Sequence, residues 1–298
     1  MDKENRLQDG TQEKAKVSGG KSGKRRHGKL FWLICGVLLV FILPGLYFGL
    51  TIQRYEIVDE RLAGDVRIAL VTDLHSCYYG KGQEKLISAI DAQKPDVILL
   101  GGDIFDDKRS DELTEEFLAG IEGRYPCYYV TGNHECWAGG EAFRKKMEIL
   151  KKYGIQRLTG DMVSFTAGDA TIRICGVDDP DIVLVQAADT ELSEIKKSIS
   201  PEEYTVLLAH RPEFFETYVD AGFDLVLAGH AHGGQWRIPG ILNGLYAPNQ
   251  GLFPKYAGGL FQKGKTTMIV SRGLARESTP IPRFYDAPEL VIIELKKP

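Results

Sequence analysis

Apolar runs of four to seven residues alternate with helix-type patterns along the part of the chain that follows residue 65. Runs at 66–71, 96–100 and 125–131 are separated by amphipathic stretches at 83–94 and 111–122. Strands that alternate with helices in this way are typical of a layered α/β fold. Between residues 141 and 199 the pattern predicts two helices and three short strands, around Ile155, Val163 and Ile172. Later apolar runs predict strands at 204–209, 224–228 and 289–295.

One apolar run is far longer than any strand. Residues 30–50 are 21 consecutive uncharged and mostly apolar residues. As a helix this stretch is roughly 30 Å long, which matches the thickness of the hydrocarbon core of a bilayer. It predicts a single transmembrane anchor. A cleavable signal peptide is the alternative, but its apolar region is usually shorter and ends in small residues, which are not found near Leu50.

The charges on either side of this run differ. Residues 1–29 hold nine Lys or Arg against four Asp or Glu, and the positive-inside rule then predicts a cytoplasmic tail and an extracytoplasmic domain. Arg25-Arg26 leaves a twin-arginine export signal as an alternative, although the surrounding residues fit it poorly. The tail is rich in Lys, Gly, Ser and Gln, which predicts disorder. Residues 51–65 are interpreted as a linker, and residues 66–298 as one folded domain.

Composition limits the partners of that domain. The chain has 298 residues, 43% hydrophobic and 26% charged, which is enough for a substantial core. Residues 51–298 hold 28 Lys or Arg against 37 Asp or Glu, a net charge of −9. No basic stripe of the kind that binds nucleic acid is visible, so no nucleic-acid partner is expected.

Polar residues gather where the predicted strands end. Five of the six histidines lie at such ends, with Asp73, Asp103 and Asn133 beside them. Ligand sites of open α/β sheets form at the carboxyl ends of strands. Imidazole, carboxylate and amide oxygen without thiolate suit Mn, Fe or Zn. The acidic stretch Asp178-Asp179-Pro180-Asp181 is interpreted as a turn, because it has a proline and no strand end beside it. The five histidines are His75, His134, His210, His230 and His232.

These motifs, taken together, resemble the calcineurin-like metallophosphoesterases over residues 66–298. The resemblance implies an α/β fold in which two mixed sheets form a layered sandwich flanked by helices. The segments 244–251 and 271–273 further resemble the membrane-associated bacterial branch, which includes enzymes similar to UDP-diacylglucosamine pyrophosphohydrolases. The motifs that carry the resemblance are Asp73-x-His75, Gly102-Asp103, Gly132-Asn133-His134-Glu135, His210 and Gly229-His230-x-His232.

The resemblance also implies two adjacent divalent transition-metal ions, with the choice among Mn, Fe and Zn left open. They would activate a hydroxide for in-line attack on phosphorus. One ion would be held by Asp73, His75 and His232, the other by Asn133, His210 and His230, with Asp103 bridging both.

Residues near these ligands have predicted roles of their own. His134 would face the substrate and protonate the leaving oxygen or stabilise the developing charge. The alternative is a supporting hydrogen bond to Asp103 or Asp73. Glu135 would orient a ligand rather than react. Arg211 and Arg272 are candidate phosphate-binding residues because guanidinium groups pair well with phosphate.

The predicted function is a membrane-anchored phosphohydrolase that cleaves a phosphodiester or pyrophosphate bond in a small-molecule or lipid-linked substrate, such as an envelope precursor. The alternative is a catalytically silent metal-binding or scaffold protein of the same fold. The stretch 242–261, rich in Gly and aromatic residues, would form a lip for an acyl chain or the membrane, or simply cover the core.

Cys77 and Cys136 each lie two residues after a motif histidine, so a disulfide between them is one hypothesis and free thiols are the other. Cys127 and Cys175 are left without a predicted partner.

Overall fold

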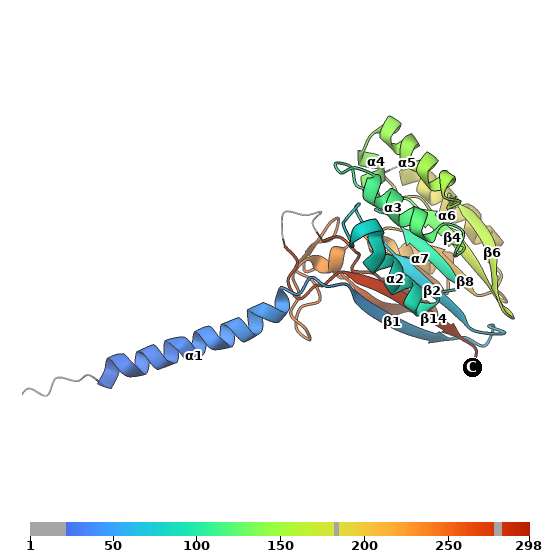
Figure 1. Ribbon diagram of the computed structural model, residues 1–298. Helices are drawn as coiled ribbons and strands as arrows, with labels where there is room; N and C mark the ends of the chain where they lie inside the picture. The colour runs from blue at the N-terminus through green and yellow to red at the C-terminus, as the bar shows by residue number, and fades with distance from the viewer. Residues whose placement is uncertain (1–21, 182–184, 277–281) are drawn as a thin grey trace, which may run out of the picture. The chain divides into compact units, whose positions relative to one another are not determined.

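The computed structural model describes residues 22–181, 185–276 and 282–298. It divides into two compact units, residues 1–44 and residues 45–298. The described part of the first unit is helix α1 (Ser22–Gly45) without its last residue, which belongs to the second unit (Figure 1). Its window Gly28–Gly45 has a mean hydropathy of 2.0, and by length and composition this helix could cross a membrane.

The bounds of α1 differ from the prediction at both ends. Residues 22–29, predicted as part of a disordered tail, are helical, and residues 1–21 of that tail lie outside the described residues. The helix ends at Gly45, so residues 46–50 of the predicted anchor are not helical. Pro44, which lacks an N–H, and Gly45, a weak helix former, stand at this end.

The second unit contains a first six-stranded sheet with the order β1-β14-β2-β3-β4-β5. Strands β2, β3, β4 and β5 run parallel, and β14 is antiparallel to β2. The sheet is therefore mixed. Its strands are β1 (Thr51–Val58), β14 (Glu289–Lys296), β2 (Val66–Val71), β3 (Val97–Gly101), β4 (Cys127–Val130) and β5 (Gln156–Arg157).

The second six-stranded sheet has the order β12-β13-β9-β8-β7-β6. Its central strands β13, β9, β8 and β7 are parallel, and an antiparallel strand closes each edge. A small two-stranded sheet pairs β10 (Tyr246–Ala247) with β11 (Gly251–Leu252). The large sheet consists of β12 (Gly259–Lys263), β13 (Thr266–Val270), β9 (Leu225–Ala228), β8 (Thr205–Leu208), β7 (Ala170–Gly176) and β6 (Asp161–Ala167).

Strand β1 corrects the predicted linker. Residues 51–58 pair in parallel with β14 along their whole length, from Thr51 opposite Glu289 to Val58 opposite Lys296. Every second residue of β1 is exposed and the others are half-buried, as expected for a strand at the edge of a sheet. Because an edge strand has weak apolar alternation, the sequence pattern did not distinguish it from a linker.

The two large sheets pack face to face, with helices on both outer faces. Successive residues of a central strand enter different cores. In β2, Leu70 packs between the sheets and Val71 packs against the helices of the first sheet. In β3, Leu99 and Leu100 are divided in the same way. This burial on both faces explains why the central strands are continuous apolar runs. The prediction of two mixed sheets flanked by helices is confirmed. The helices are α2 (Glu84–Gln93), α3 (Glu112–Ile121), α4 (Asn133–Trp137), α5 (Gly140–Lys152), α6 (Val185–Ser198) and α7 (Phe215–Ala221).

Candidate metal centre

All seven residues predicted to bind metal lie directly after parallel strands, at one edge of the two sheets. Three of these strands belong to the first sheet and two to the second. All seven side chains are buried. The residues are Asp73 and His75 after β2, Asp103 after β3, Asn133 after β4, His210 after β8, and His230 and His232 after β9.

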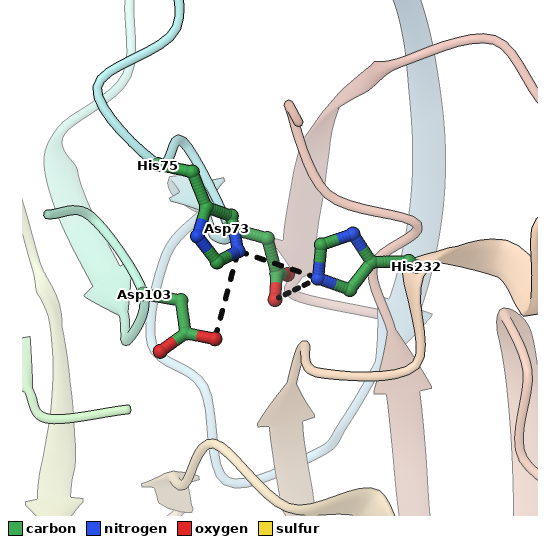
Figure 2. A group of neighbouring side chains, drawn as sticks. All are labelled: Asp73, His75, Asp103 and His232. Atoms are coloured by element: carbon green, nitrogen blue, oxygen red, sulfur yellow. Dashed lines mark hydrogen bonds and ion pairs between the residues drawn. The ribbon is translucent and has the colours of Figure 1, made fainter. Parts of the chain in front are cut away.

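The first group of ligand atoms comes from Asp73, His75, Asp103 and His232 (Figure 2). One ligand atom from each of these side chains lies within 4.8 Å of the others. The Nε2 atoms of His75 and His232 are 3.3 Å apart, and His232 Nε2 is 3.5 Å from Asp73 Oδ1. Nitrogen and oxygen atoms that converge in this way can share one cation.

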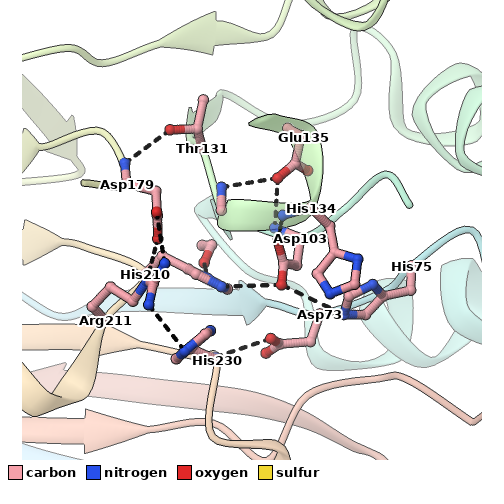
Figure 3. A network of polar contacts seen from close by, with 12 residues as sticks. Asp73, His75, Asp103, Thr131, His134, Glu135, Asp179, His210, Arg211 and His230 are labelled. Carbon is pink, nitrogen blue, oxygen red and sulfur yellow. Dashed lines mark hydrogen bonds and ion pairs between the residues drawn. The ribbon is translucent and has the colours of Figure 1, made fainter. Parts of the chain in front are cut away.

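The second group consists of Asp103, His210 and His230 (Figure 3). Asp103 Oδ2 lies 3.1 Å from His210 Nε2 and 3.6 Å from His75 Nε2, so Asp103 belongs to both groups. A carboxylate in this position can bind two cations and offset their mutual repulsion. The arrangement is compatible with a dinuclear metal site.

Whether cations fit this site can be judged from its buried polar atoms that lack a hydrogen-bond partner. Among the described residues, such atoms include Asp73 Oδ2, Asp103 Oδ2, Asn133 Oδ1 and His210 Nε2. Burying an unpaired polar atom costs about 1–3 kcal/mol, so a cluster of them in one place needs a ligand. Each of the four atoms can offer a lone pair to a cation, and the donor set of N and O atoms suits Mn, Fe or Zn.

The backbone around the ligands is strained. Five ligand residues have a positive φ: Asp73 at 51°, His75 at 47°, Asp103 at 51°, His230 at 66° and His232 at 46°. Each such residue costs of order 1–3 kcal/mol, and strain of this kind persists where it is needed for function.

Glycines give these ligands room. A Cβ added at Gly273, where φ is +73°, would lie 2.6 Å from Asp73 Cβ, and a Cβ at Gly102 would lie 2.6 Å from His210 Nδ1. The backbone therefore packs directly against two ligand side chains, at positions where only glycine fits.

Hydrogen bonds on the far side of three imidazole rings determine which nitrogen faces the site. His75 Nδ1 is 3.2 Å from Asp106 Oδ2, and His210 Nδ1 is 2.8 Å from the carbonyl oxygen of Gly101. Because these oxygens can only accept, both Nδ1 atoms must donate, which leaves the Nε2 lone pairs for a cation. His230 is reversed: its Nε2 lies 2.9 Å from Asn249 Oδ1, and its Nδ1 remains for the cation.

The charge states of the histidines follow from burial and from Asp103. Burial, together with the positive charges of His210 and Arg211, holds the pKa of His230 well below its usual value. Burial and the neighbouring His75 do the same to the pKa of His232. Burial also lowers the pKa of His210, but the carboxylate of Asp103 outweighs it and raises the pKa to about 10. A cation would therefore displace a proton from His210 on binding.

Comparison with known proteins identifies the family. The family model of the calcineurin-like phosphoesterases matches residues 66–234, which include every residue of both groups. This chain belongs to the calcineurin-like phosphoesterases. It is a metal-dependent phosphoesterase.

Three relatives illustrate the similarity. A metallophosphoesterase of Aquifex aeolicus is 26% identical over 87% of this chain and 98% of its own length. The phosphodiesterase YaeI of Escherichia coli is 29% identical over 81% of this chain and 88% of its own length. A transmembrane protein with a metallophosphoesterase domain from Bos taurus is 28% identical over 72% of this chain, which matches 50% of that protein.

In this phosphoesterase, Glu135 organises the loop that carries Asp103. Its two carboxylate oxygens accept hydrogen bonds from the backbone N–H groups of Asp103, Gly132, Ile104 and Phe105 at 2.8–3.1 Å. Burial, with the charge of Asp103 beside it, raises the pKa of Glu135 to about 7, although the backbone hydrogen bonds lower it. The carboxyl group faces the backbone rather than the ligand atoms, so the predicted orienting role agrees with its contacts.

The predicted catalytic residue His134 lies at the edge of the phosphoesterase site. Its ring contacts that of His75, with the centroids 4.4 Å apart, and its backbone N–H donates to Asp103 Oδ1 at 2.9 Å. The side chain keeps 20% of its surface exposed, more than any predicted ligand. Its Nδ1 lies 2.7 Å from Asp107 Oδ1, so the ring is held by Asp107 rather than by Asp103 or Asp73.

The two candidate phosphate-binding arginines are both engaged in ion pairs. Arg211 is buried and donates from Nε to Asp179 at 2.5 Å, while its Nη1 lies 3.3 Å from His230 Nε2 (Figure 3). Arg272 donates from Nε to Glu289 at 2.6 Å. Arg211 thus adjoins the predicted ligand His230, whereas Arg272 supports the start of β14.

Four residues of the site were not predicted. Asp106 and Asp107 hold His75 and His134, Asn249 holds His230, and Asp179 holds Arg211. Asp106 and Asp107 were detectable, because they follow the strand-end motif Gly102-Asp103 by three and four residues.

Two interpretations of sequence features are settled by contacts. Residues 178–181 form no ligand group with the described residues, and Asp179 has the structural role given above. The assumption that no strand ends beside them is wrong, because β7 ends at Gly176. All five cysteines are free, so the hypothesis of a Cys77–Cys136 disulfide is wrong. The Sγ of Cys136 instead donates to the carbonyl oxygen of Asp181 at 2.8 Å.

Proposed function

We propose that this chain is a membrane-anchored phosphohydrolase that cleaves a phosphodiester or pyrophosphate bond in a substrate carried at a lipid surface. The observation that supports the reaction is the buried carboxylate of Asp103, which reaches both ligand groups. When bound, two divalent cations would supply an activated water and polarise the phosphoryl oxygens. Asp73, His75, Asp103 and His232 would hold one of them, and Asp103, Asn133, His210 and His230 the other.

The chain's own residues would complete the reaction at the exposed edge of the site. The side chain of His134 is 20% exposed, and Asp107 fixes its ring through Nδ1. Because Asp107 accepts a hydrogen bond, Nδ1 carries a proton and Nε2 is free to exchange one with the substrate. His134 would protonate the leaving oxygen as the bond to phosphorus breaks.

The apolar helix α1 and the charge of its flank support the anchor. A span with a mean hydropathy of 2.0 over Gly28–Gly45 is long enough for a bilayer, and one relative is named as a transmembrane protein. The Lys and Arg residues at the N-terminal flank of the apolar span would stay on the cytoplasmic side, and the phosphoesterase domain would then lie outside the cytoplasm. An enzyme held in this way meets lipid-linked phosphoesters more often than dissolved ones. Its net charge of −9 over residues 51–298 disfavours nucleic acid as a substrate.

Hydrolysis by the metal-loaded full-length protein in detergent tests the reaction. Bis(p-nitrophenyl) phosphate, a nucleotide-linked sugar pyrophosphate and a lipid-linked pyrophosphate are compared as substrates with Mn²⁺. Asp103→Asn should lose both the bound metal and the hydrolysis of all three. The control Asp169→Asn, in the exposed turn between β6 and β7, should retain both. Wild-type turnover by Asp103→Asn would overturn the proposed reaction.

A further inference from the structure

Five large apolar side chains are exposed on one stretch of the phosphoesterase domain, residues 236–253. We name this group the apolar rim. Ile241 is 83% exposed, and Leu252 and Phe253 are each 67% exposed. Trp236 and Tyr246 complete the rim at 44% and 49%. Scattered single apolar residues on a surface are ordinary, but a group drawn from one short stretch marks an interaction site.

The rim is held in place by backbone pairing. Tyr246 lies opposite Leu252 in the pairing of β10 with β11, and Phe253 N–H donates to the carbonyl oxygen of Leu245 at 2.8 Å. Trp236 donates from Nε1 to the carbonyl oxygen of Pro282 at 2.9 Å, and its ring contacts that of Phe284. These hydrogen bonds therefore hold in place the segments that carry the apolar side chains.

The same framework touches the metal centre. Leu245 N–H donates to the carbonyl oxygen of Gly234 at 3.0 Å, two residues after the ligand His232. Asn249, between β10 and β11, reaches His230 through its Oδ1 at 2.9 Å. The rim and the ligands thus belong to one connected group of loops at the same edge of the sheets.

The chain also enters the domain at this edge. Strand β14 is antiparallel to β2 and β1 is parallel to β14, so β1 begins where β2 ends, beside the metal ligands. Figure 1 shows the loops in orange next to the start of β1. Gly45, the first residue of the second unit, accepts a hydrogen bond from Tyr285 N–H at 2.7 Å, and the neighbouring Phe284 contacts Trp236. The start of the phosphoesterase domain is therefore held close to the rim.

We propose that the apolar rim inserts into the interfacial layer of a lipid bilayer and so holds the metal centre toward the membrane surface. This inference rests on the proposed membrane anchor. Because moving exposed apolar surface out of water is favourable, five such side chains supply a substantial second attachment. Tryptophan and tyrosine prefer the bilayer interface, where an apolar ring and a polar atom are both satisfied, and the rim contains one of each. The substrate class that fits is a phosphoester whose lipid part remains in the bilayer while its phosphate enters the site.

Tryptophan fluorescence in brominated lipid tests the rim and the anchor separately, since the chain has three tryptophans. The full-length protein is reconstituted in phosphatidylcholine vesicles with and without dibrominated acyl chains. Variants that keep only Trp32, only Trp236 or only Trp137 are compared, with Phe replacing the others. Trp32 lies in α1 and reports the anchor, Trp236 reports the rim, and Trp137 in α4 is an exposed control. Brominated lipid should diminish the emission of Trp32 and Trp236 but not that of Trp137.

Substitutions in the rim complete the test. In the protein that keeps only Trp236, Leu252→Asp with Phe253→Asp should abolish the quenching of Trp236. Hydrolysis of a dissolved chromogenic diester should stay at the level of the parent protein, which shows that the variant is folded. Quenching of Trp32 without quenching of Trp236 would overturn the inference and leave the anchor standing, whereas loss of both would overturn the anchor. Unquenched Trp236 together with cross-linking between rims would assign this surface to a second copy of the chain instead.

Discussion

Gly273 offers a sharp test of how the backbone positions a metal ligand. It follows β13, on the second sheet, and packs against Asp73 from the first. A Cβ at this position would lie 2.6 Å from Asp73 Cβ and 2.7 Å from Asp73 Oδ2, distances that real Cβ contacts do not reach. Gly273→Ala should therefore push the carboxylate of Asp73 out of the ligand group.

The expected magnitude has two parts that a control can separate. A non-glycine residue in the left-handed conformation costs about 1–2 kcal/mol of folding free energy. Gly264, with a φ of +59° and no atom within 4 Å of an added Cβ, carries only that cost when replaced by Ala. Gly273→Ala carries the same cost and also displaces Asp73. Disturbing the support of a ligand typically lowers metal affinity about 10- to 100-fold, or about 1.4–2.8 kcal/mol.

Calorimetric titration of the chelator-treated full-length protein with Mn²⁺ measures this affinity, and urea unfolding measures stability. The two variants should lose similar stability from the backbone, while only Gly273→Ala should bind Mn²⁺ more weakly and hydrolyse a diester more slowly. If Gly273→Ala binds Mn²⁺ as tightly as Gly264→Ala, the contact between Gly273 and Asp73 does not position the carboxylate.

Three further outcomes are expected. Asp107 holds the His134 ring but belongs to neither ligand group. Asp107→Asn should therefore lower diester turnover about 10- to 100-fold while the metal content stays unchanged. A loss of metal in elemental analysis would contradict this. Burial raises the pKa of Asp286 from 3.8 to about 6, so the folded protein keeps a proton that the unfolded chain has released. The free energy of unfolding of the protein should therefore fall by about 2–3 kcal/mol between about pH 4 and pH 6. Asp286→Asn should reduce this pH dependence in urea unfolding. An equal pH dependence in the variant would show that Asp286 does not hold the proton. Cys136 should react with iodoacetamide before Cys127, whose burial raises its pKa to about 12, and equal labelling by mass spectrometry would show that the core opens.

The parts of the fold that the sequence predicted are those buried on both faces. Strands β2, β3, β8 and β9 are continuous apolar runs that end in polar motifs, so both their existence and their carboxyl ends were visible. β1 and the β12–β13 hairpin were missed. β1 and β12 are edge strands whose residues are half-buried or exposed, and half-burial leaves too little apolar alternation to recognise. β13 is buried, but it begins with Thr266-Thr267, so its apolar run of Met268-Ile269-Val270 is too short to be recognised as a strand.

For the site, the ligand types were predictable and their supports mostly were not. The motif residues converge from five strands, as the position of each strand end implied. Asn249 and Gly273 act through contacts that join segments far apart in the chain, and nothing in their local pattern reveals such contacts. For Arg211 the residue type alone suggested phosphate binding. Its ion pair with Asp179 depends on tertiary structure and could not be predicted from the sequence.

The place of β14 in the first sheet has a consequence for biogenesis. Residues 289–296 lie between β1 and β2, so a nascent chain that has already released β1 and β2 from the ribosome still lacks the strand that joins them. Until those residues emerge, the edges of both strands remain open to incorrect pairing, and closure then spans more than 230 residues of intervening chain. Folding of this domain is therefore expected to be post-translational and slow, and to depend on chaperones that shield unpaired strands.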